Sequence, residues 1–198
     1  MKRTDISKIR KAMEKTLEEK RYEHTLGVAY TATSLAMRYG ESLENAELAG
    51  LLHDCAKEMD DDKAISLCEK HHISITEVER KNPALLHAKT GSFLAMHTYK
   101  VDNGEIINAI LNHTTGRPGM SLLEKIIFVA DYIEPSRKKA ANLPEIRQLA
   151  FVDLDAALLK ILEDTLEYLK QKEEAIDPMT EKTYRYYREI AETKQSDI

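Results

Sequence analysis

Five short segments of the chain each carry histidine or aspartate side chains that could bind a metal ion. They hold His24 in YEHTLGVA, His53 and Asp54 in LLHDCAKE, His87 in LLHAKTG, His113 in ILNHTTG and Asp131 in IIFVADYIE. Each group lies within or at the end of an apolar stretch, where burying an ionisable side chain is costly without a partner or a metal. Imidazole and carboxylate together suit zinc, manganese, iron or nickel.

Six candidate ligands exceed what one catalytic ion usually takes from a protein. Two ions about 3.5–4 Å apart that share a carboxylate fit this set better. The natural assignment gives one ion His24, His53, Asp54 and Asp131, and gives the other His87, His113 and a shared Asp54. Such a pair activates water and holds phosphate oxygens, so the set indicates hydrolysis of phosphoesters or phosphoanhydrides.

Residues near these ligands are predicted to contact an anionic substrate. They are Lys57, Thr114, Thr115, Gly116, Arg117, Tyr132, Glu134 and Arg137. Lys57 follows Asp54 by about one helical turn, so both can face one cavity, and we predict that these two residues are catalytic. The hydroxyls and backbone N–H groups of the Thr114 turn can hold phosphate oxygens, and an arginine can bind phosphate through two bonds.

Each of these residues also has a structural interpretation. Lys57 precedes a run of acidic residues and could be a solvated surface lysine. Gly116 could end a helix, and Tyr132 could pack rather than stack on a base. Near the end of the chain, Tyr184, Tyr186 and Tyr187 alternate with Arg185 and Arg188, which indicates either a base-stacking strip or tyrosines packed on the core.

Apolar residues at helical spacing predict the elements that position these groups. The expected helices cover about 6–17, 21–39, 42–57, 61–71, 83–97, 104–113, 121–134, 153–175 and 180–190. The expected N-caps are Thr4 or Asp5, Ser42, Asp60, Asn82 before Pro83, Asn103, Ser121 and Thr180, and Gly40 is the expected C-terminal glycine. No strand alternation is clear, so the fold class is all-α, a helical bundle of about eight to nine helices in a single domain.

Composition narrows the possible partners and location. A chain of 198 residues suits one domain, and its net charge of −5 disfavours stable nucleic-acid binding. An anionic ligand therefore needs local cations or metal. The chain has no apolar run of about 18 residues and no signal-peptide core, so no membrane span is expected. Its two cysteines form no CxxC motif, which favours a reducing, cytoplasmic location.

The order H…HD…H…H…D resembles the HD-domain metal phosphohydrolases. The strings AGLLHDCAKE, NHTTGRPGMSLLEKIIFVADYIEPSR and a tail that contains Pro-Met-Thr are similar to the YqeK-like branch, bacterial symmetrical bis(5′-nucleosyl)-tetraphosphatases. The resemblance covers residues 6–192, nearly the whole chain. It implies one HD domain over residues 1–198, with a core of about 20–135 on which C-terminal helices of about 144–192 pack.

The resemblance also implies an activity. It points to a homodimer with a dinuclear metal site, iron first and manganese, cobalt, nickel or zinc as alternatives, that hydrolyses diadenosine tetraphosphate to two ADP. The apolar stripe on the helix of about 153–175 is the expected place for dimer contacts. The alternatives are another HD nucleotide phosphohydrolase (a nucleotidase or a guanosine polyphosphate hydrolase), a non-catalytic nucleotide-sensing adaptor, or a bare helical scaffold.

Overall fold

The chain folds entirely from helices. The computed structural model describes the backbone of residues 5–196 and the side chains of residues 5–193. Within that range there are eleven α-helices and one 3-10 helix. Their bounds are α1 (Ile6–Thr16), α2 (Glu19–Tyr39), α3 (Leu43–Leu52), α4 (Asp61–Lys70), α5 (Glu77–Lys81), η1 (Pro83–Leu86), α6 (His87–His97), α7 (Gly104–Leu111), α8 (Leu122–Ile133), α9 (Leu143–Leu149), α10 (Leu154–Gln171) and α11 (Pro178–Ser196).

The all-α prediction is confirmed, but the expected count of eight to nine helices is too low. Helices α5 and α9 were not expected, because segments of 5 and 7 residues are too short to show a helical period. The helix expected over 83–97 divides at His87, where the 3-10 turn η1 gives way to α6. The helix expected to reach residue 57 ends at Leu52 and continues as tighter turns.

Most predicted caps are confirmed. The side chains of Asp5, Ser42, Asp60, Asn103 and Ser121 accept hydrogen bonds from backbone N–H groups in the first turns of their helices. Gly40 ends α2 with a positive φ of 78°. Thr4, the other candidate for the first cap, lies outside the described residues.

Asn82 is the N-cap residue of η1 with Pro83 after it, as predicted, although its side chain makes no capping bond. One cap was predicted wrongly. Thr180 is buried inside α11, which begins at Pro178, and the Asp177 carboxylate accepts from Met179 N at the start of this helix instead. Asp177 is the better cap because Pro178 suits the first position of a helix.

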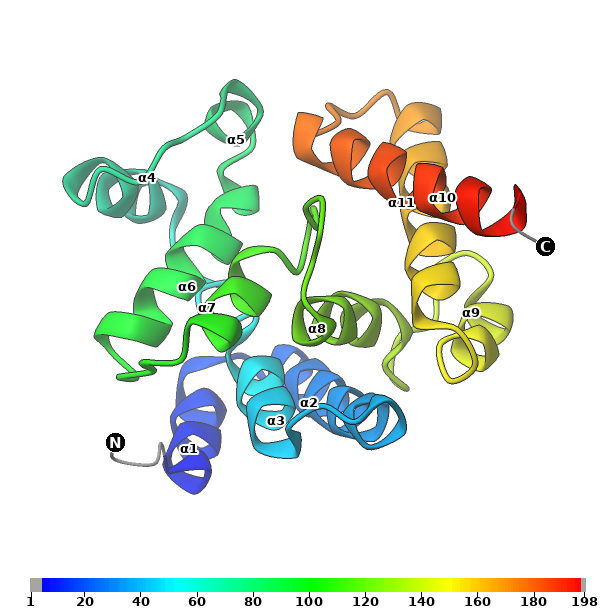
Figure 1. Cartoon of the computed structure of the whole chain (residues 1–198). Helices are drawn as coiled ribbons and strands as arrows, with labels where there is room; N and C mark the ends of the chain where they lie inside the picture. The colour runs from blue at the N-terminus through cyan, green and yellow to red at the C-terminus, as the bar shows by residue number, and fades with distance from the viewer. Residues whose placement is uncertain (1–4, 197–198) are drawn as a thin grey trace.

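Helix α8 runs through the middle of the molecule (Figure 1). In that view α2 and α3 lie below it, α6 and α7 to one side, and α9, α10 and α11 to the other, and α2, α3, α7, α9 and α10 all contact it. The apolar side chains of these helices form one main core. Among the described residues, no helix is both long enough and apolar enough to span a membrane.

Two sequence features have clear structural roles in this core. A Cβ atom on Gly50 would lie 2.6 Å from the Cα of Ala29, so the glycine allows α3 to approach α2 closely. The apolar stripe of α10 is buried within the chain at Leu154, Leu158 and Ile161. These three side chains belong to the core of the chain, whereas Thr165 and Leu169 of the same stripe are partly exposed, and a dimer contact there stays a prediction.

Candidate metal centre

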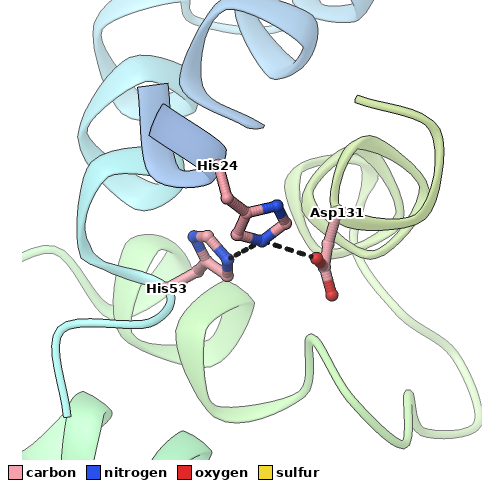
Figure 2. Close-up of side chains that lie close together, drawn as sticks. All are labelled: His24, His53 and Asp131. Carbon is pink, nitrogen blue, oxygen red and sulfur yellow. Dashed lines mark hydrogen bonds and ion pairs between the residues drawn. The ribbon is translucent and has the colours of Figure 1, made fainter. Parts of the chain in front are cut away.

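The six predicted metal ligands come together at the ends of five helices. His24 lies on α2 and Asp131 on α8, while His87 begins α6. His53 and Asp54 directly follow α3, and His113 lies two residues beyond α7. All are buried except Asp131, which is partly exposed. Figure 2 shows His24, His53 and Asp131 converging from α2, the end of α3 and α8.

The early end of α3 shapes one side of this cluster. After Leu52 the backbone forms three-residue turns, in which Cys55 N donates to Leu52 O and Lys57 N donates to Asp54 O. Residues three apart lie above one another in such turns. Asp54 and Lys57 therefore share a face, and the Cys55 thiol points away, 3.6 Å from the carbonyl oxygen of Gly91.

The first group of ligand atoms surrounds His24. Its Nε2 lies 3.1 Å from Asp131 Oδ1 and 3.3 Å from His53 Nε2, as the dashed lines in Figure 2 show. Asp54 Oδ2 lies 3.5 Å from His53 Nε2 and 3.9 Å from His24 Nε2. His24, His53 and Asp131 thus have ligand atoms within 4.8 Å of one another, and Asp54 lies beside this group.

The second group lies at the other oxygen of the same carboxylate. Asp54 Oδ1 is 3.3 Å from His87 Nε2 and 3.6 Å from His113 Nε2. The two imidazole Nε2 atoms are 3.1 Å apart. Asp54 thus presents one oxygen to each group, which is the geometry of a bridging carboxylate.

Backbone carbonyls set the orientation of three of these imidazoles. The Nδ1 atoms of His53, His87 and His113 each donate to the carbonyl oxygen three residues earlier, at 2.7 Å in every case. A carbonyl only accepts, so these nitrogens carry the proton and leave the Nε2 lone pairs facing the cluster. Metal-binding histidines are held in the same way.

The Glu134 carboxylate sets the orientation of the His24 imidazole, whose Nδ1 donates to Glu134 Oε1 at 3.1 Å. Gly27 makes room for this contact, because a Cβ there would lie 2.5 Å from Glu134 Oε2. Burial alone would lower the pKa of His24, but Asp131 and Glu134 together raise it.

The donor set fits a divalent metal. The unprotonated Nε2 atoms of His87 and His113, which are 3.1 Å apart, repel each other unless a cation lies between them. Two nitrogens bound to one ion at about 2.1 Å lie about 3.0–3.4 Å apart. Asp54 Oδ1 is buried, and within the described residues it has no hydrogen-bond partner. The cluster therefore suggests a site for divalent metal.

The protonation states of four of the six candidate ligands also suit a metal. Burial lowers the pKa of His53 to about 4 and that of His87 to about 3. Burial alone would raise the pKa of Asp54, but neighbouring imidazoles, His53 first, hold it well below its usual value. The pKa of Asp131 is low for a similar reason, since the hydrogen bond with His24 opposes the effect of burial. Neutral imidazoles and ionised carboxylates are the forms that bind metals.

A charged cavity of about 520 Å³ opens at the first group. It is lined by Glu18, Lys20, Arg21, His24, Lys57, Glu58, Glu134 and Arg137. Lys57 Nζ lies 3.3 Å from both ring nitrogens of His87, and burial lowers the pKa of its amine. We call this cavity the cationic mouth.

Two arginines of the cationic mouth each bind a predicted ligand. Arg137 donates to Asp131 Oδ1 at 2.8 Å, and Arg21 lies 2.9 Å from Asp54 Oδ2. Arg21 was not predicted from the sequence. It could have been found, because it precedes His24 by three residues and so lies on the same helical face.

Other predicted substrate residues lie away from the mouth. Both oxygens of Glu124 hold the Arg117 guanidinium, at 2.7 and 2.6 Å. The Tyr132 hydroxyl donates to Ala141 O at 3.2 Å. Gly116 lies against α11, where a Cβ would be 2.7 Å from Thr183 Cγ2.

Thr114 and Thr115 line a second cavity beside the cluster. In α11, Tyr187 is buried, Tyr184 is partly buried and Tyr186 is exposed, so the packing interpretation of this helix holds for Tyr187 but not for Tyr186.

Comparisons with known proteins agree with this geometry. The HD-domain family profile matches residues 21–136. The chain is 41% identical over 172 residues to "Bis(5'-nucleosyl)-tetraphosphatase, symmetrical" of Bacillus subtilis, covering 86% of this chain and 90% of that protein. It is 34% identical over 185 residues to the protein of the same name from Staphylococcus aureus, covering 92% and 94%.

A solved structure has the same fold. A crystal structure described as a predicted HD superfamily hydrolase involved in NAD metabolism, from Clostridium acetobutylicum, superposes with a TM-score of 0.90. The two chains are 40% identical, and the match covers 93% of this chain and 97% of that one. The chain therefore belongs to the HD-domain family, in the branch that contains the bacterial symmetrical bis(5′-nucleosyl)-tetraphosphatases.

Proposed function

We propose that this protein is a metal-dependent hydrolase that cleaves diadenosine tetraphosphate symmetrically into two ADP. The names of its relatives, which match most of the chain, support this substrate and product. The observation that carries the chemistry is the Asp54 carboxylate, which has one oxygen in each group of ligands. The cationic mouth beside it suits a polyphosphate.

The proposed cofactor is a pair of ions, with iron as the preferred metal and manganese, cobalt, nickel or zinc as alternatives. One ion would be held by His24, His53, Asp54 and Asp131, and the other by His87, His113 and the same Asp54. When bound, such a pair lowers the pKa of a coordinated water to near neutral and neutralises charge on phosphate oxygens.

The side chains of the mouth have separate proposed roles. Arg21 and Arg137 hold the polyphosphate, since an arginine binds phosphate through two parallel bonds. Lys57 stabilises the charge that develops on the departing nucleoside diphosphate. Glu134 orients His24 through the bond to its Nδ1. The contacts of substrate with the Thr114–Gly116 turn, Arg117 and Tyr132 remain predictions.

We also propose a domain organisation, an oligomeric state and a cellular location for this protein. The metal-binding core is about residues 20–135, and C-terminal helices of about 144–192 pack on it through the contact of α10 with α8. A homodimer is proposed from the family resemblance. A reducing, cytoplasmic location is supported by two cysteines, Cys55 and Cys68, that are free and buried.

A substrate panel tests the reaction. Metal-analysed protein is incubated with diadenosine tetraphosphate, a nucleoside monophosphate and a guanosine polyphosphate at equal concentrations, and kcat/KM is measured for each. We expect the dinucleotide to be preferred by at least tenfold. Preference for either other substrate would make the protein a different HD phosphohydrolase. Binding of metal and nucleotide without turnover of any of them would favour the sensing adaptor.

A further inference from the structure

A second cavity lies on the far side of the residues that hold the second ligand group. It has a volume of about 300 Å³, and its wall comes from the start of α5, from η1 and the first turn of α6, from the end of α7 with the connection to α8, and from the start of α11. In Figure 1 that connection stands between α5 and α6 on one side and the start of α11 on the other. We call this space the α11 cavity.

The α11 cavity shares its wall with the metal centre. Asn112 and Thr114, which line it, stand on either side of His113, and Ala88 follows His87 directly. The cavity is thus bordered by the same two chain segments that carry His87 and His113. Three sequence motifs line this cavity: LLHAKTG, NHTTG and the Pro-Met-Thr segment near the end of the chain.

The chemistry of the α11 cavity differs from that of the cationic mouth. Leu85, Leu111 and Met179 supply apolar surface. The charge of Lys89 is compensated by Glu79, whose carboxylate lies 2.7 Å from its amine. The cavity therefore suits a flat, largely apolar group with a few hydrogen-bonding atoms, whereas the mouth suits phosphate.

Two polar groups in the wall are available to such a ligand. The Asn112 side-chain nitrogen donates to Asn108 O and Glu124 Oε1, while its amide oxygen has no partner among the described residues. Thr114 also lines the cavity, and its hydroxyl makes no hydrogen bond among the described residues, whereas the neighbouring Thr115 hydroxyl donates to Gly116 O at 3.0 Å. An amide oxygen accepts from the exocyclic amino group of a purine, and a hydroxyl can donate to a ring nitrogen.

We propose that the α11 cavity binds one purine nucleoside of the substrate while its polyphosphate lies across the metal centre and the cationic mouth. The inference rests on the proposed function. Small-molecule sites range over about 300–1,000 Å³, so this cavity has room for one nucleoside and not for two. The second nucleoside stays outside it, and Thr114 and Thr115 contact the nucleoside rather than the phosphates of the mouth.

Tryptophan reporters test this subsite directly, because the chain contains no tryptophan. Met179→Trp places an indole at the rim, where the native side chain is 37% exposed. Lys182→Trp, at an exposed residue lining the same cavity, serves if the first variant folds poorly. Met37→Trp on α2 is the matched control, since Met37 is 64% exposed and does not line the cavity.

The measurement is a titration of each manganese-loaded variant with ADP and, separately, with inorganic pyrophosphate. Bases stack on aromatic rings. We expect ADP to quench the emission of Met179→Trp and Lys182→Trp with the same midpoint that calorimetry gives for ADP binding. Pyrophosphate should leave both unchanged, and Met37→Trp should respond to neither ligand. Silent reporters in protein that calorimetry shows to bind ADP would overturn the proposal, as would equal responses to ADP and pyrophosphate.

The results of these titrations distinguish failure of the nucleoside subsite from failure of the proposed reaction. Wild-type protein that releases ADP from diadenosine tetraphosphate, together with silent reporters, would refute the subsite and leave the reaction standing. Reporters that respond to ADP in a protein without turnover would support the subsite and refute the reaction.

Discussion

The Asp54 carboxylate joins the two groups of candidate ligands. Its Oδ1 faces His87 and His113, and its Oδ2 faces His53 and Arg21. His53 also reaches both sides of the cluster, because it has a ring nitrogen within 4.8 Å of ligand atoms of His24 and Asp131 and within 4.8 Å of ligand atoms of Asp54 and His113. Removing the single charge of Asp54 should therefore disturb both metal positions at once.

For this reason we expect Asp54→Asn to lose bound metal and activity together. The amide keeps the shape of the side chain but is a poor ligand, so kcat/KM should fall by at least about 100-fold. Metal content and turnover are measured on the same preparation, with Asp102→Asn at an exposed site as control. Hydrolysis by Asp54→Asn protein that holds no metal would contradict the account.

Lys57 should behave differently, because it touches the cluster without offering a lone pair while protonated. We expect Lys57→Met to keep its metal content and to lose about 100-fold in kcat, the scale of removing one charge-stabilising donor. Lys63→Met, at an exposed lysine on α4, should change neither quantity. A Lys57→Met protein with normal kcat, or one that has lost its metal, would show that this role is wrong.

Residue type and spacing were enough to indicate the six clustered groups, since each ionisable side chain interrupts an apolar run. They also indicated Arg137, which lines the mouth, but they were not enough for Arg117 and Arg21. The sequence placed Arg117 beside His113, but only the structure shows that Glu124 binds its guanidinium. Arg21 stands in an unremarkable charged stretch, and its contact with Asp54 depends on the packing of α2 against the end of α3.

At the scale of the elements, the ends of the helices were harder to predict from the sequence than their middles. Helical period predicted the bounds of α2, α4 and α8 to within two residues, but it placed the end of α10 four residues too late. It placed the end of α3 five residues too late, since LLHDCAKE continues the apolar pattern beyond Leu52. The short helices α5 and α9 depend on tertiary packing and gave no periodic signal.

The close approach of α2 and α3 can be tested at Gly50. An alanine there would bring its Cβ to 2.6 Å from Ala29 Cα, so the helices must separate. Overpacking of this kind costs about 1–3 kcal/mol, which for a chain of this size lowers Tm by about 3–10 °C.

Thermal unfolding of Gly50→Ala and Gly104→Ala provides the comparison. A Cβ on Gly104 would meet nothing within 4 Å, so this control variant should keep its Tm within about 2 °C. Equal Tm values for the two variants would mean that the α2 and α3 backbones are not in close contact.

At the scale of the whole molecule, metal binding should be linked to stability, because the ligands come from five helices spread over residues 24–131. An ion at about 100 times its Kd adds about 2.7 kcal/mol to the free energy of unfolding. Adding manganese to chelator-treated protein should thus raise Tm by about 5–10 °C. The same rise in Asp54→Asn would show that the ion binds elsewhere.

The central claim is symmetrical hydrolysis at this metal centre, and product analysis tests it most directly. Metal-analysed protein is incubated with diadenosine tetraphosphate, and the nucleotides are separated by liquid chromatography over the course of the reaction. The account predicts ADP as the only product, formed at two molecules per substrate by wild-type protein and not by Asp54→Asn. Release of ATP and AMP, or ADP formation by both proteins alike, would contradict it.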